Sequence, residues 1–398
     1  MPKRRIGTVG ITPAGALGVA FFYHLTERLN RLDGTVTFVE RDGSSSAAAL
    51  RTAGALRLAD DGEVREVSAK EIFRSSLLEC GRSGCLPEVL LVCTQPDQLL
   101  GVLTTWVRLF EAVYAEEGAT AIDELPVLVL ASNGIYFQRA RQFLIERLEE
   151  GTLFGRLPDL WPDLMPRLVG RLLRGVTIQT GQREGSGANA VYRPGPRGRT
   201  RIAGGDAAIR ARAVELLSAL GGWFEVADDS SPTRVEFDKA LVNLTANLLG
   251  QIAAIDEGGD FRRLTAGEML LPAHADEVRE LVTHVVEVGR AVRAYRAEES
   301  VDEILERMRK SLETHADHVP SSLQWIEGQL QRQSLSPRLT PTEAWLLEPL
   351  IRYAHGAGLE EAARYFETLT RRVEHRLALA IASNSHKRYG ERAAQRNR

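Results

Sequence analysis

Two hydrophobic patterns divide this chain. In the first half, short and nearly continuous apolar runs alternate with stretches of helical periodicity. Four of these runs are predicted as strands: 6–11, 35–40, 89–93 and 125–131. Apolar runs of this kind are typical of parallel strands that are covered on both faces. A helical pattern, 13–31, lies between the first two strands. The order of strand, helix and strand predicts a doubly wound α/β fold.

The pattern changes twice further along. Residues 172–204 combine β-branched runs with Gly/Pro turns, which predicts an antiparallel extension of the sheet. A helix over 206–220 and a strand over 223–226 follow, and the loop 228–234 is a candidate boundary. Beyond this loop the periodicity is helical to about residue 383. We therefore expect a Rossmann-like dinucleotide-binding domain with an antiparallel sheet extension (1–230), an all-helical domain (231–385), and a basic, frayed tail (386–398).

Composition places the chain among ordinary globular proteins. It has 398 residues, of which 44% are hydrophobic and 26% charged, and its net charge is −3. This charge gives no general attraction to nucleic acid or to an anionic membrane. No apolar run reaches the length of a membrane span. Only three cysteines are present, Cys80, Cys85 and Cys93, which favours a reducing, cytoplasmic location over a disulfide framework.

A glycine-rich segment follows the first predicted strand and opens a helix. This is the context that a dinucleotide fingerprint requires. The spacing of Gly15 and Gly18 fits its last two glycines, with a lengthened turn after Gly10. Thr12 is predicted as the helix N-cap, with Pro13 in the first turn. The free N–H groups and the positive dipole end of such a helix would face a pyrophosphate.

The end of the second strand bears on the choice of dinucleotide. Glu40 could bind the ribose 2′-hydroxyl of NAD. Arg41 and the serines after it would instead suit the 2′-phosphate of NADP. Arg41 favours NADP, and NAD stays open as the alternative.

A polar seam runs along one apolar helix in the second half. Lys239, Asn243 and Asn247 are four residues apart in a segment that is otherwise rich in Ala, Leu, Val and Ile. Residues at this spacing lie on one helix face. A buried lysine without a partner has a displaced pKa, which is one way to make a proton donor. The alternative is a narrow solvent-facing stripe on an amphipathic helix.

Two other clusters of polar residues are not predicted to form functional sites. His315 and His318 are three residues apart, with Asp317 between them. The two histidines have no third well-placed ligand, so no metal site is predicted. Arg193, Arg197, Arg199 and Arg201 form a basic hairpin that is expected to be solvated.

Six segments together resemble the ketopantoate reductase family, which is similar to 6-phosphogluconate-dehydrogenase-like enzymes. They extend over most of the chain in the family's order: VTFVER, LLVCTQPDQ, ASNGI, FDKALVNLTANLLGQIAAI, HVPSSLQ and TPTEAWLLEPLIRYAHGAGL. The resemblance implies reduction of a 2-oxo acid to the 2-hydroxy acid by hydride transfer from the reduced form of NADP, NADPH, in pantothenate biosynthesis if the substrate is ketopantoate.

The resemblance also implies residue roles. Lys239 would be the catalytic proton donor, and Glu343 the acid that binds a substrate hydroxyl or pairs with Lys239 in the empty site. Asn243, Asn247 and Ser321 would bind substrate, with Ser322 the neighbouring choice for the serine.

On the cofactor side, Arg41 would select NADP. Gln95 stands where the family usually has a lysine. Asn133 and Gly134 match the family's turn near the nicotinamide, and Ser132 replaces its glutamine. A homodimer is a further expectation.

The chain departs from the family around the substrate. It is longer, with extra sequence near 103–124 and within 257–310, and it has Glu257 and Trp325 at unusual positions. The reaction type is therefore better defined than ketopantoate as its substrate. Two alternatives stay open. One is an opine- or imine-type dehydrogenase, and the other is a dinucleotide-binding regulator without turnover.

Overall fold

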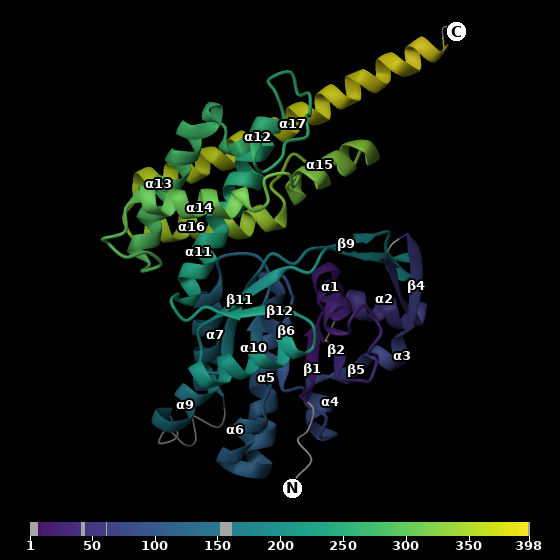
Figure 1. Ribbon diagram of the computed structural model, residues 1–398, viewed down its shortest axis with the longest axis vertical. Helices are drawn as coiled ribbons and strands as arrows, with labels where there is room; N and C mark the ends of the chain where they lie inside the picture. Colours follow the sequence, from purple (N-terminus) through teal and green to yellow (C-terminus); the bar gives the residue numbers. More distant parts are fainter. Residues whose placement is uncertain (1–6, 41–43, 61, 152–160, 397–398) are drawn as a thin grey trace. The chain divides into compact units, whose positions relative to one another are not determined.

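The computed structural model describes residues 7–40, 44–60, 62–151 and 161–396 (Figure 1). The chain divides into two compact units, Met1–Pro232 and Thr233–Arg398. The first is a mixed α/β unit and the second is helical. The predicted fold class, a Rossmann-like domain followed by a helical domain, is confirmed.

An eight-stranded sheet forms the centre of the first unit. Its strand order is β12-β11-β8-β7-β6-β1-β2-β5. The strands from β5 to β8 are mutually parallel, with β1 in the middle as in a Rossmann sheet. β11 is antiparallel to β8, as expected for the extension. The bounds are β1 Val9–Thr12, β2 Val36–Glu40, β5 Phe73–Ser76, β6 Val89–Val92, β7 Val127–Leu130, β8 Leu172–Thr177, β11 Arg199–Ala203 and β12 Trp223–Val226.

Both faces of this sheet are buried, which explains the continuous apolar runs. In β6, Val89 and Leu91 join one hydrophobic core, with α1 and α10. The alternate residues Leu90 and Val92 join the other, with α4, α5, α7 and α9. The helices of the first unit are α1 Ala16–Leu25, α2 Ser45–Ala53, α3 Ala69–Ile72, α4 Leu77–Arg82, α5 Pro96–Glu117, α6 Ala121–Glu124, α7 Phe137–Glu150, α9 Trp161–Val169 and α10 Ala207–Ala219, with short 3₁₀ turns at Gly118–Thr120 and Gly187–Asn189.

A second, four-stranded sheet was not expected from the sequence. Its order is β4-β3-β10-β9, with bounds β3 Ala55–Asp60, β4 Glu63–Ser68, β9 Gly181–Glu184 and β10 Val191–Pro194. β10 pairs parallel with β3, so segments far apart in sequence lie side by side. The sheet packs on α1, where a Cβ atom on Gly181 would lie 2.4 Å from the Ala16 carbonyl oxygen. Part of the predicted sheet extension therefore belongs to this separate layer.

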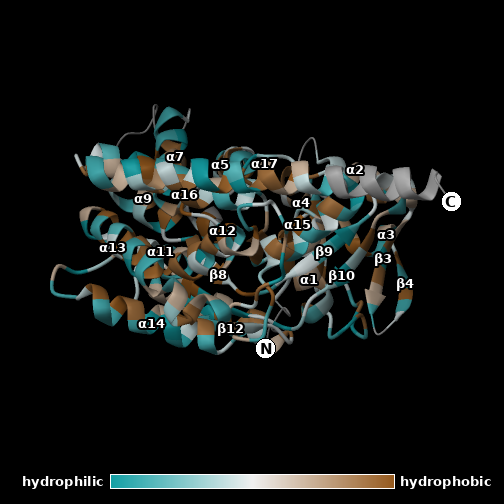
Figure 2. Cartoon of the chain, turned by 90° about the horizontal axis from the view of Figure 1, so that it is seen from above, coloured by the Kyte–Doolittle hydropathy of each residue, from teal (hydrophilic) through white to brown (hydrophobic). Residues whose placement is uncertain are grey.

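The second unit is built from amphipathic helices. Figure 2 shows hydrophilic and hydrophobic segments along α13 and α14, and the apolar residues of α14 are buried. The segments 103–124 and 257–310, which are long for the resembling family, are largely helical. The elements are α11 Pro232–Asn243, η4 Leu244–Leu249, α12 Gly250–Ala254, η5 Glu268–Leu270, η6 Pro272–His274, α13 Ala275–Ala291, α14 Val301–Glu313, α15 Ser321–Arg332, α16 Pro341–Gly356 and α17 Glu360–Arg396.

Helix α17 continues through Arg396, over most of the segment 386–398 that is expected from the sequence to be a frayed tail. Ala, Glu, Gln and Arg dominate this stretch, and all four are strong helix formers.

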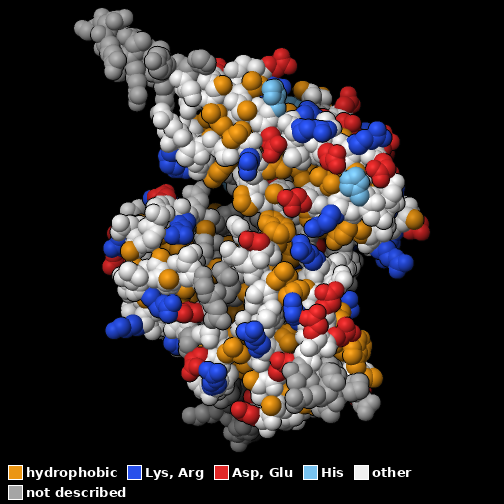
Figure 3. All heavy atoms as spheres, turned by 180° about the vertical axis from the view of Figure 1, so that it is seen from behind, with side chains coloured by type: hydrophobic (Ala, Val, Ile, Leu, Met, Phe, Trp, Pro, Cys, Tyr) orange, Lys and Arg blue, Asp and Glu red, His pale blue; other side chains and the backbone are white. Residues whose placement is uncertain are grey.

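The surface carries no dominant charge on the face that Figure 3 shows, where basic and acidic side chains are interspersed. Among the described residues, no helix combines the length and the apolar character needed to cross a membrane.

Candidate active site

The turn after β1 lies at the carboxyl edge of the parallel strands, where α/β sheets bind ligands. Helix α1 begins at Ala16, and its N-cap is Gly15, without a side-chain cap. The prediction of Thr12 as N-cap is wrong, because Thr12 is still paired in β1. The residues between Thr12 and Gly15 form the turn that leads into the helix.

The three glycines of this segment have different surroundings. A Cβ atom on Gly15 would find nothing nearer than Pro13 Cγ at 4.0 Å, which leaves room for a ligand at the helix N-terminus. On Gly18 it would lie 2.3 Å from the Pro13 carbonyl oxygen, so this glycine permits close contact of helix and turn. On Gly10, inside β1, it would lie 2.8 Å from Val39 Cγ2. Gly15 and Gly18 thus have the geometry of the second and third fingerprint glycines, whereas Gly10 serves packing.

Two buried hydroxyls at the same edge have no partner. Thr12 and Thr94 are 3% and 1% exposed, and their Oγ1 atoms make no hydrogen bond within the described residues. Thr12 is the last residue of β1 and Thr94 follows the adjacent parallel strand β6, and a 2.7 Å bond from Cys93 N to Thr12 O joins the two segments. Buried hydroxyls are normally hydrogen-bonded, so these two are available to a bound molecule. Gln95, next to Thr94, is the exposed N-cap of α5 and makes no side-chain cap bond.

The carboxyl end of β2 carries an ion pair. Glu40, whose side chain is 17% exposed, lies 3.1 Å from an Nη atom of Arg51. Arg41, the predicted NADP-selecting residue, lies outside the described residues.

A sharp turn follows β7. Asn133 is exposed, and Gly134 has φ +128°, a conformation that favours glycine. The carbonyl oxygens of Ser132 and Gly134 accept hydrogen bonds from Arg174. Arg174 was not singled out from the sequence, although an arginine within the apolar run LLRGVT was a visible signal.

The polar seam of the second unit lies on a helix that changes its winding. Lys239 and Asn243 are on α11, and Asn247 is within a π-helical segment, Leu244–Leu249. In an α-helix, four residues turn about 40° beyond a full turn. A π turn is wider, so the step from Asn243 to Asn247 turns less and opposes this drift. The local winding keeps the three side chains closer to one line than a continuous α-helix would.

Ser322, rather than Ser321, reaches the seam. The Ser322 Oγ donates to Asn247 Oδ1 at 3.0 Å, and its backbone N–H donates to the same oxygen at 3.3 Å. Ser322 is buried, whereas Ser321 is exposed at the start of α15. Of the two serines that the sequence offered, the geometry favours Ser322.

Two titratable groups of this unit have strongly displaced pKa values. Burial lowers the pKa of Lys239 to about 8. Burial also raises the pKa of Glu343 to about 7, against the opposing effect of its own backbone N–H. Glu343 is the third residue of α16 and is 3% exposed, and its Oε2 makes no hydrogen bond in the described part of the chain.

The suggested pairing of Lys239 with Glu343 is not present. No ion pair or hydrogen bond joins them within the described ranges. Each group therefore keeps its capacity to interact with a bound molecule.

Gln251 extends the seam by one more turn and was not identified from the sequence. It is 1% exposed, and neither atom of its amide has a partner among the described residues.

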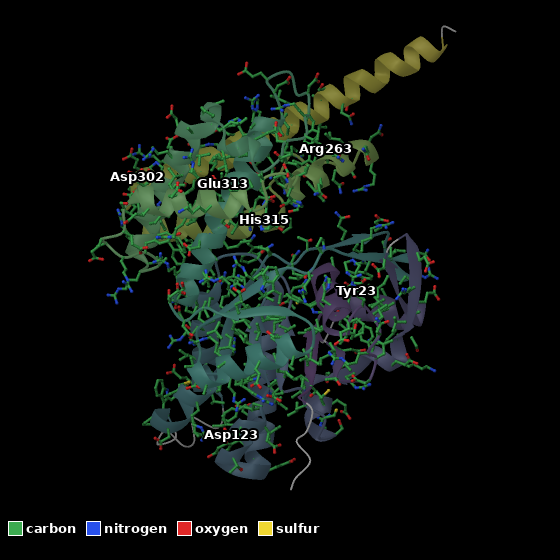
Figure 4. The ribbon with its side chains drawn as sticks, viewed as in Figure 1. Tyr23, Asp123, Arg263, Asp302, Glu313 and His315 are labelled. Carbon is green, nitrogen blue, oxygen red and sulfur yellow. The ribbon has the colours of Figure 1, made fainter. Side chains whose placement is uncertain are left out.

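The remaining candidates from the sequence are the histidine cluster and the cysteines. Among the described residues, no group of three or more His, Cys, Asp or Glu side chains is arranged to hold a metal ion. His315, which Figure 4 labels, follows α14 in the second unit. No disulfide joins Cys80, Cys85 or Cys93, which all lie within the described ranges.

Solved structures share the fold of this chain. A ternary structure of D-mandelate dehydrogenase with NADH and anilino(oxo)acetate has a TM-score of 0.61 and 19% identity, covering 94% of this chain and 99% of the other. A ketopantoate reductase from Ralstonia eutropha has a TM-score of 0.55 and 16% identity, covering 93% and 99%. A structure named as a probable 2-dehydropantoate 2-reductase from Bacillus subtilis has a TM-score of 0.55 and 19% identity, covering 91% and 99%.

No protein-family model and no curated protein sequence matches the chain. At these identities the structural likeness shows the fold, and it extends over nearly the whole length of each solved chain.

Proposed function

We propose that this protein is a NAD(P)-dependent oxidoreductase that reduces a 2-oxo acid to the 2-hydroxy acid. The observation that carries the proposal is the seam of Lys239, Asn243 and Asn247, with a lysine whose pKa is lowered to about 8 by burial. The seam follows a Rossmann-like unit along the chain, and enzymes named for D-mandelate and ketopantoate share the fold of this chain.

The residues of the first unit fit a dinucleotide. The open space at Gly15 would admit a pyrophosphate at the N-terminus of α1, and Gly18 permits the close helix–turn packing there. The unpartnered hydroxyls of Thr12 and Thr94 add donors at the same edge. Gln95 would contact the cofactor beside them, and the Asn133–Gly134 turn would position the nicotinamide. When bound, the nicotinamide supplies the hydride that reduces the carbonyl carbon.

Lys239 is assigned the proton transfer. Its ammonium donates a proton from Nζ to the carbonyl oxygen as negative charge develops there, and it regains a proton from solvent afterwards. The same positive charge stabilises the developing alkoxide. A pKa near 8 keeps most of the lysine protonated at neutral pH while making the proton easy to release.

The amides and the acid orient the substrate. Asn243 and Asn247 hydrogen-bond substrate oxygens, and Ser322 holds the Asn247 amide through its Oδ1. This bond leaves the Asn247 amino group as the donor that faces a substrate oxygen. Glu343, in its ionised form, accepts a hydrogen bond from a substrate hydroxyl.

NADPH is the expected cofactor. Arg41 would bind the 2′-phosphate, and Arg51 compensates the charge of Glu40, which would otherwise repel a phosphate. NADH is the alternative, because D-mandelate dehydrogenase was solved with NADH and Glu40 could bind a 2′-hydroxyl. Arg41→Ala should raise the KM for NADPH and leave that for NADH unchanged. An equal change for both cofactors would contradict the assignment.

The substrate class extends from ketopantoate to bulkier 2-oxo acids. Solved proteins with this fold include enzymes named for ketopantoate and for D-mandelate. Ketopantoate turnover would imply a place in pantothenate biosynthesis, and a homodimer is the assembly expected in solution. An opine- or imine-type dehydrogenase is the second candidate, because Trp325 and Glu257 depart from the pattern of the ketopantoate reductase family near the expected substrate loop and speak against ketopantoate itself.

The test is nicotinamide absorbance loss with NADPH or NADH and a panel of 2-oxo acids. The panel contains ketopantoate, the 2-oxo acid of mandelate and branched aliphatic acids, each with and without an amine. Lys239→Ala should lower kcat at least about 100-fold while the cofactor still binds. Turnover only with an amine present would favour the imine class. Cofactor binding without any turnover would favour a regulator.

A further inference from the structure

We infer that Arg174 is a positioning residue that fixes the Asn133 turn for hydride transfer. The inference deepens the proposed function and rests on it. Arg174 lies in β8, opposite Leu130 of β7, at the carboxyl edge of the sheet. It is 2% exposed, so its guanidinium is held inside the first unit.

The guanidinium spans both sides of the turn. One Nη atom donates to the carbonyl oxygens of Leu130 at 2.5 Å and Gly175 at 2.9 Å. The other donates to those of Ser132 at 2.8 Å and Gly134 at 3.1 Å. The bonds from both Nη atoms thus connect the end of β7 with the carbonyls on either side of Asn133.

Tyr136 contacts both Arg174 and the turn. The Arg174 guanidinium carbon lies 4.5 Å from the centre of the Tyr136 ring. The Tyr136 hydroxyl donates to the Ser132 carbonyl oxygen at 2.9 Å and lies 2.7 Å from Ser132 Oγ. The Ser132 carbonyl is therefore held from two directions, and the backbone on both sides of Asn133 is fixed while its side chain is exposed.

The hydrogen bonds to the turn depend on the shape of the Arg174 guanidinium as well as on its charge. A planar guanidinium with fixed donors can bond several carbonyls at set directions and stack on a ring, whereas a lysine ammonium is a point donor on a flexible chain. Arg174→Lys therefore keeps the charge and loses the geometry. A misplacement of about 1 Å at a reacting centre can lower the rate on the order of 100-fold.

Arg171 provides a matched control. It is also buried, at 8% exposure, and one of its Nη atoms donates to the Leu125 carbonyl oxygen at 2.7 Å. Its second partner is Asp123, which Figure 4 labels in the same unit. Leu125 precedes β7, so Arg171 serves the amino edge of the same strand pair, away from the Asn133 turn.

The experiment compares Arg174→Lys with Arg171→Lys in the full-length protein. We expect Arg174→Lys to lower kcat by about 10- to 100-fold with the KM for the 2-oxo acid within about threefold. The isotope effect on kcat with cofactor deuterated at the transferred position should rise, because hydride transfer becomes limiting. Arg171→Lys should lower the melting temperature comparably and keep kcat within about twofold. Similar kcat losses in both variants would overturn the inference.

Two further measurements separate its failure from that of the proposed function. In an Asn133→Ala background, Arg174→Lys should cost less than about threefold in kcat, because the group that it positions is already absent. An undiminished cost there would overturn the inference. Hydrogen exchange of segment 131–137 should be faster in Arg174→Lys than in Arg171→Lys, and this needs no turnover. Absence of turnover in the wild type would instead overturn the proposed function. Equal hydrogen exchange of segment 131–137 in the two variants would show that Arg174 does not fix the Asn133 turn.

Discussion

Burial favours the neutral forms of both Lys239 and Glu343, so it lowers the pKa of the lysine and raises the pKa of the glutamate. The lysine has a pKa of about 8 and the glutamate about 7. If both side chains were exposed to water, their pKa values would lie far from neutrality. If they formed an ion pair with each other, each would stabilise the charged form of the other. Burial without mutual pairing leaves a protonated lysine and an ionised glutamate together near neutral pH, which is the combination that the proposed reduction needs.

The first prediction is a narrow pH profile for kcat/KM in the direction of reduction. The rate should fall above about pH 8 as Lys239 loses its proton, and below about pH 7 as Glu343 gains one. Initial rates across pH 5.5–9.5 would check this. Glu343→Gln should remove the acid limb and keep the alkaline one. An alkaline limb that persists in Lys239→Ala would contradict the role of the lysine.

The second prediction concerns stability. The pKa of Glu343 rises from 4.5 to about 7 on folding, so the folded state binds more protons in between, and stability falls as pH rises through this range. Above pH 7 the buried carboxylate costs on the order of 3 kcal/mol. Glu343→Gln should therefore gain stability relative to wild type at pH 8 and not at pH 4.5.

Urea unfolding at both pH values measures this difference. Lys239→Met is the control, because the lysine pKa is lowered from 10.5 to about 8, so the cost of burying its charge is nearly the same at both pH values and is lost only as pH rises further toward 10.5. A wild type and a Glu343→Gln variant with the same pH dependence would contradict the prediction.

At the scale of elements, the π-helical segment Leu244–Leu249 is the decisive feature of the second unit. Such segments are rare and frequently lie at functional sites. Here the segment contains Asn247, whose side chain is held from α15 by Ser322. Three consecutive helical elements, α11, η4 and α12, thus present one seam whose middle is anchored from a fourth helix.

The third prediction tests that anchor. Ser322→Ala removes the hydroxyl that orients the Asn247 amide and should raise the KM for the 2-oxo acid by about 3- to 10-fold, because one buried hydrogen bond contributes about 1 kcal/mol. The KM for the cofactor should not change. Ser321→Ala, at the exposed neighbouring position, is the matched control and should behave as wild type. The reverse pattern would restore Ser321 as the functional serine.

At the scale of the whole molecule, the proposed function assigns cofactor binding and proton transfer to separate compact units. The dinucleotide fingerprint and the Asn133 turn belong to Met1–Pro232, and the lysine seam belongs to Thr233–Arg398. We therefore expect the cofactor and the 2-oxo acid to protect different segments of the chain from hydrogen exchange.

The fourth prediction follows for hydrogen exchange. NADPH should slow exchange in segments 12–18, 94–96 and 132–136, because they surround its expected site. Adding a 2-oxo acid analogue should extend protection to segments 239–251 and 321–323. Mass-resolved exchange of the full-length protein measures both. Cofactor protection confined to other segments, such as the edge of the second sheet, would contradict the assignment of the fingerprint.

The sequence by itself determined the features that depend on local pattern. Apolar runs predicted β1, β2, β6 and β7, because both faces of that sheet are buried, and helical periodicity predicted the second unit. The spacing of Lys239, Asn243 and Asn247 placed them on one helix face, and Gly15 with Gly18 marked the start of α1.

The tertiary structure decided what depends on contacts between distant residues. Pairing of β10 with β3 made a separate sheet, since strand partners are not encoded locally. The bonds of Asn247 to Ser322 distinguished that serine from its neighbour, which has the same chemistry in sequence. Arg174 gained its place because folding brought β8 beside the end of β7. The unpaired burial of Lys239 and Glu343 likewise sets their pKa values, because desolvation depends on the packing around a side chain.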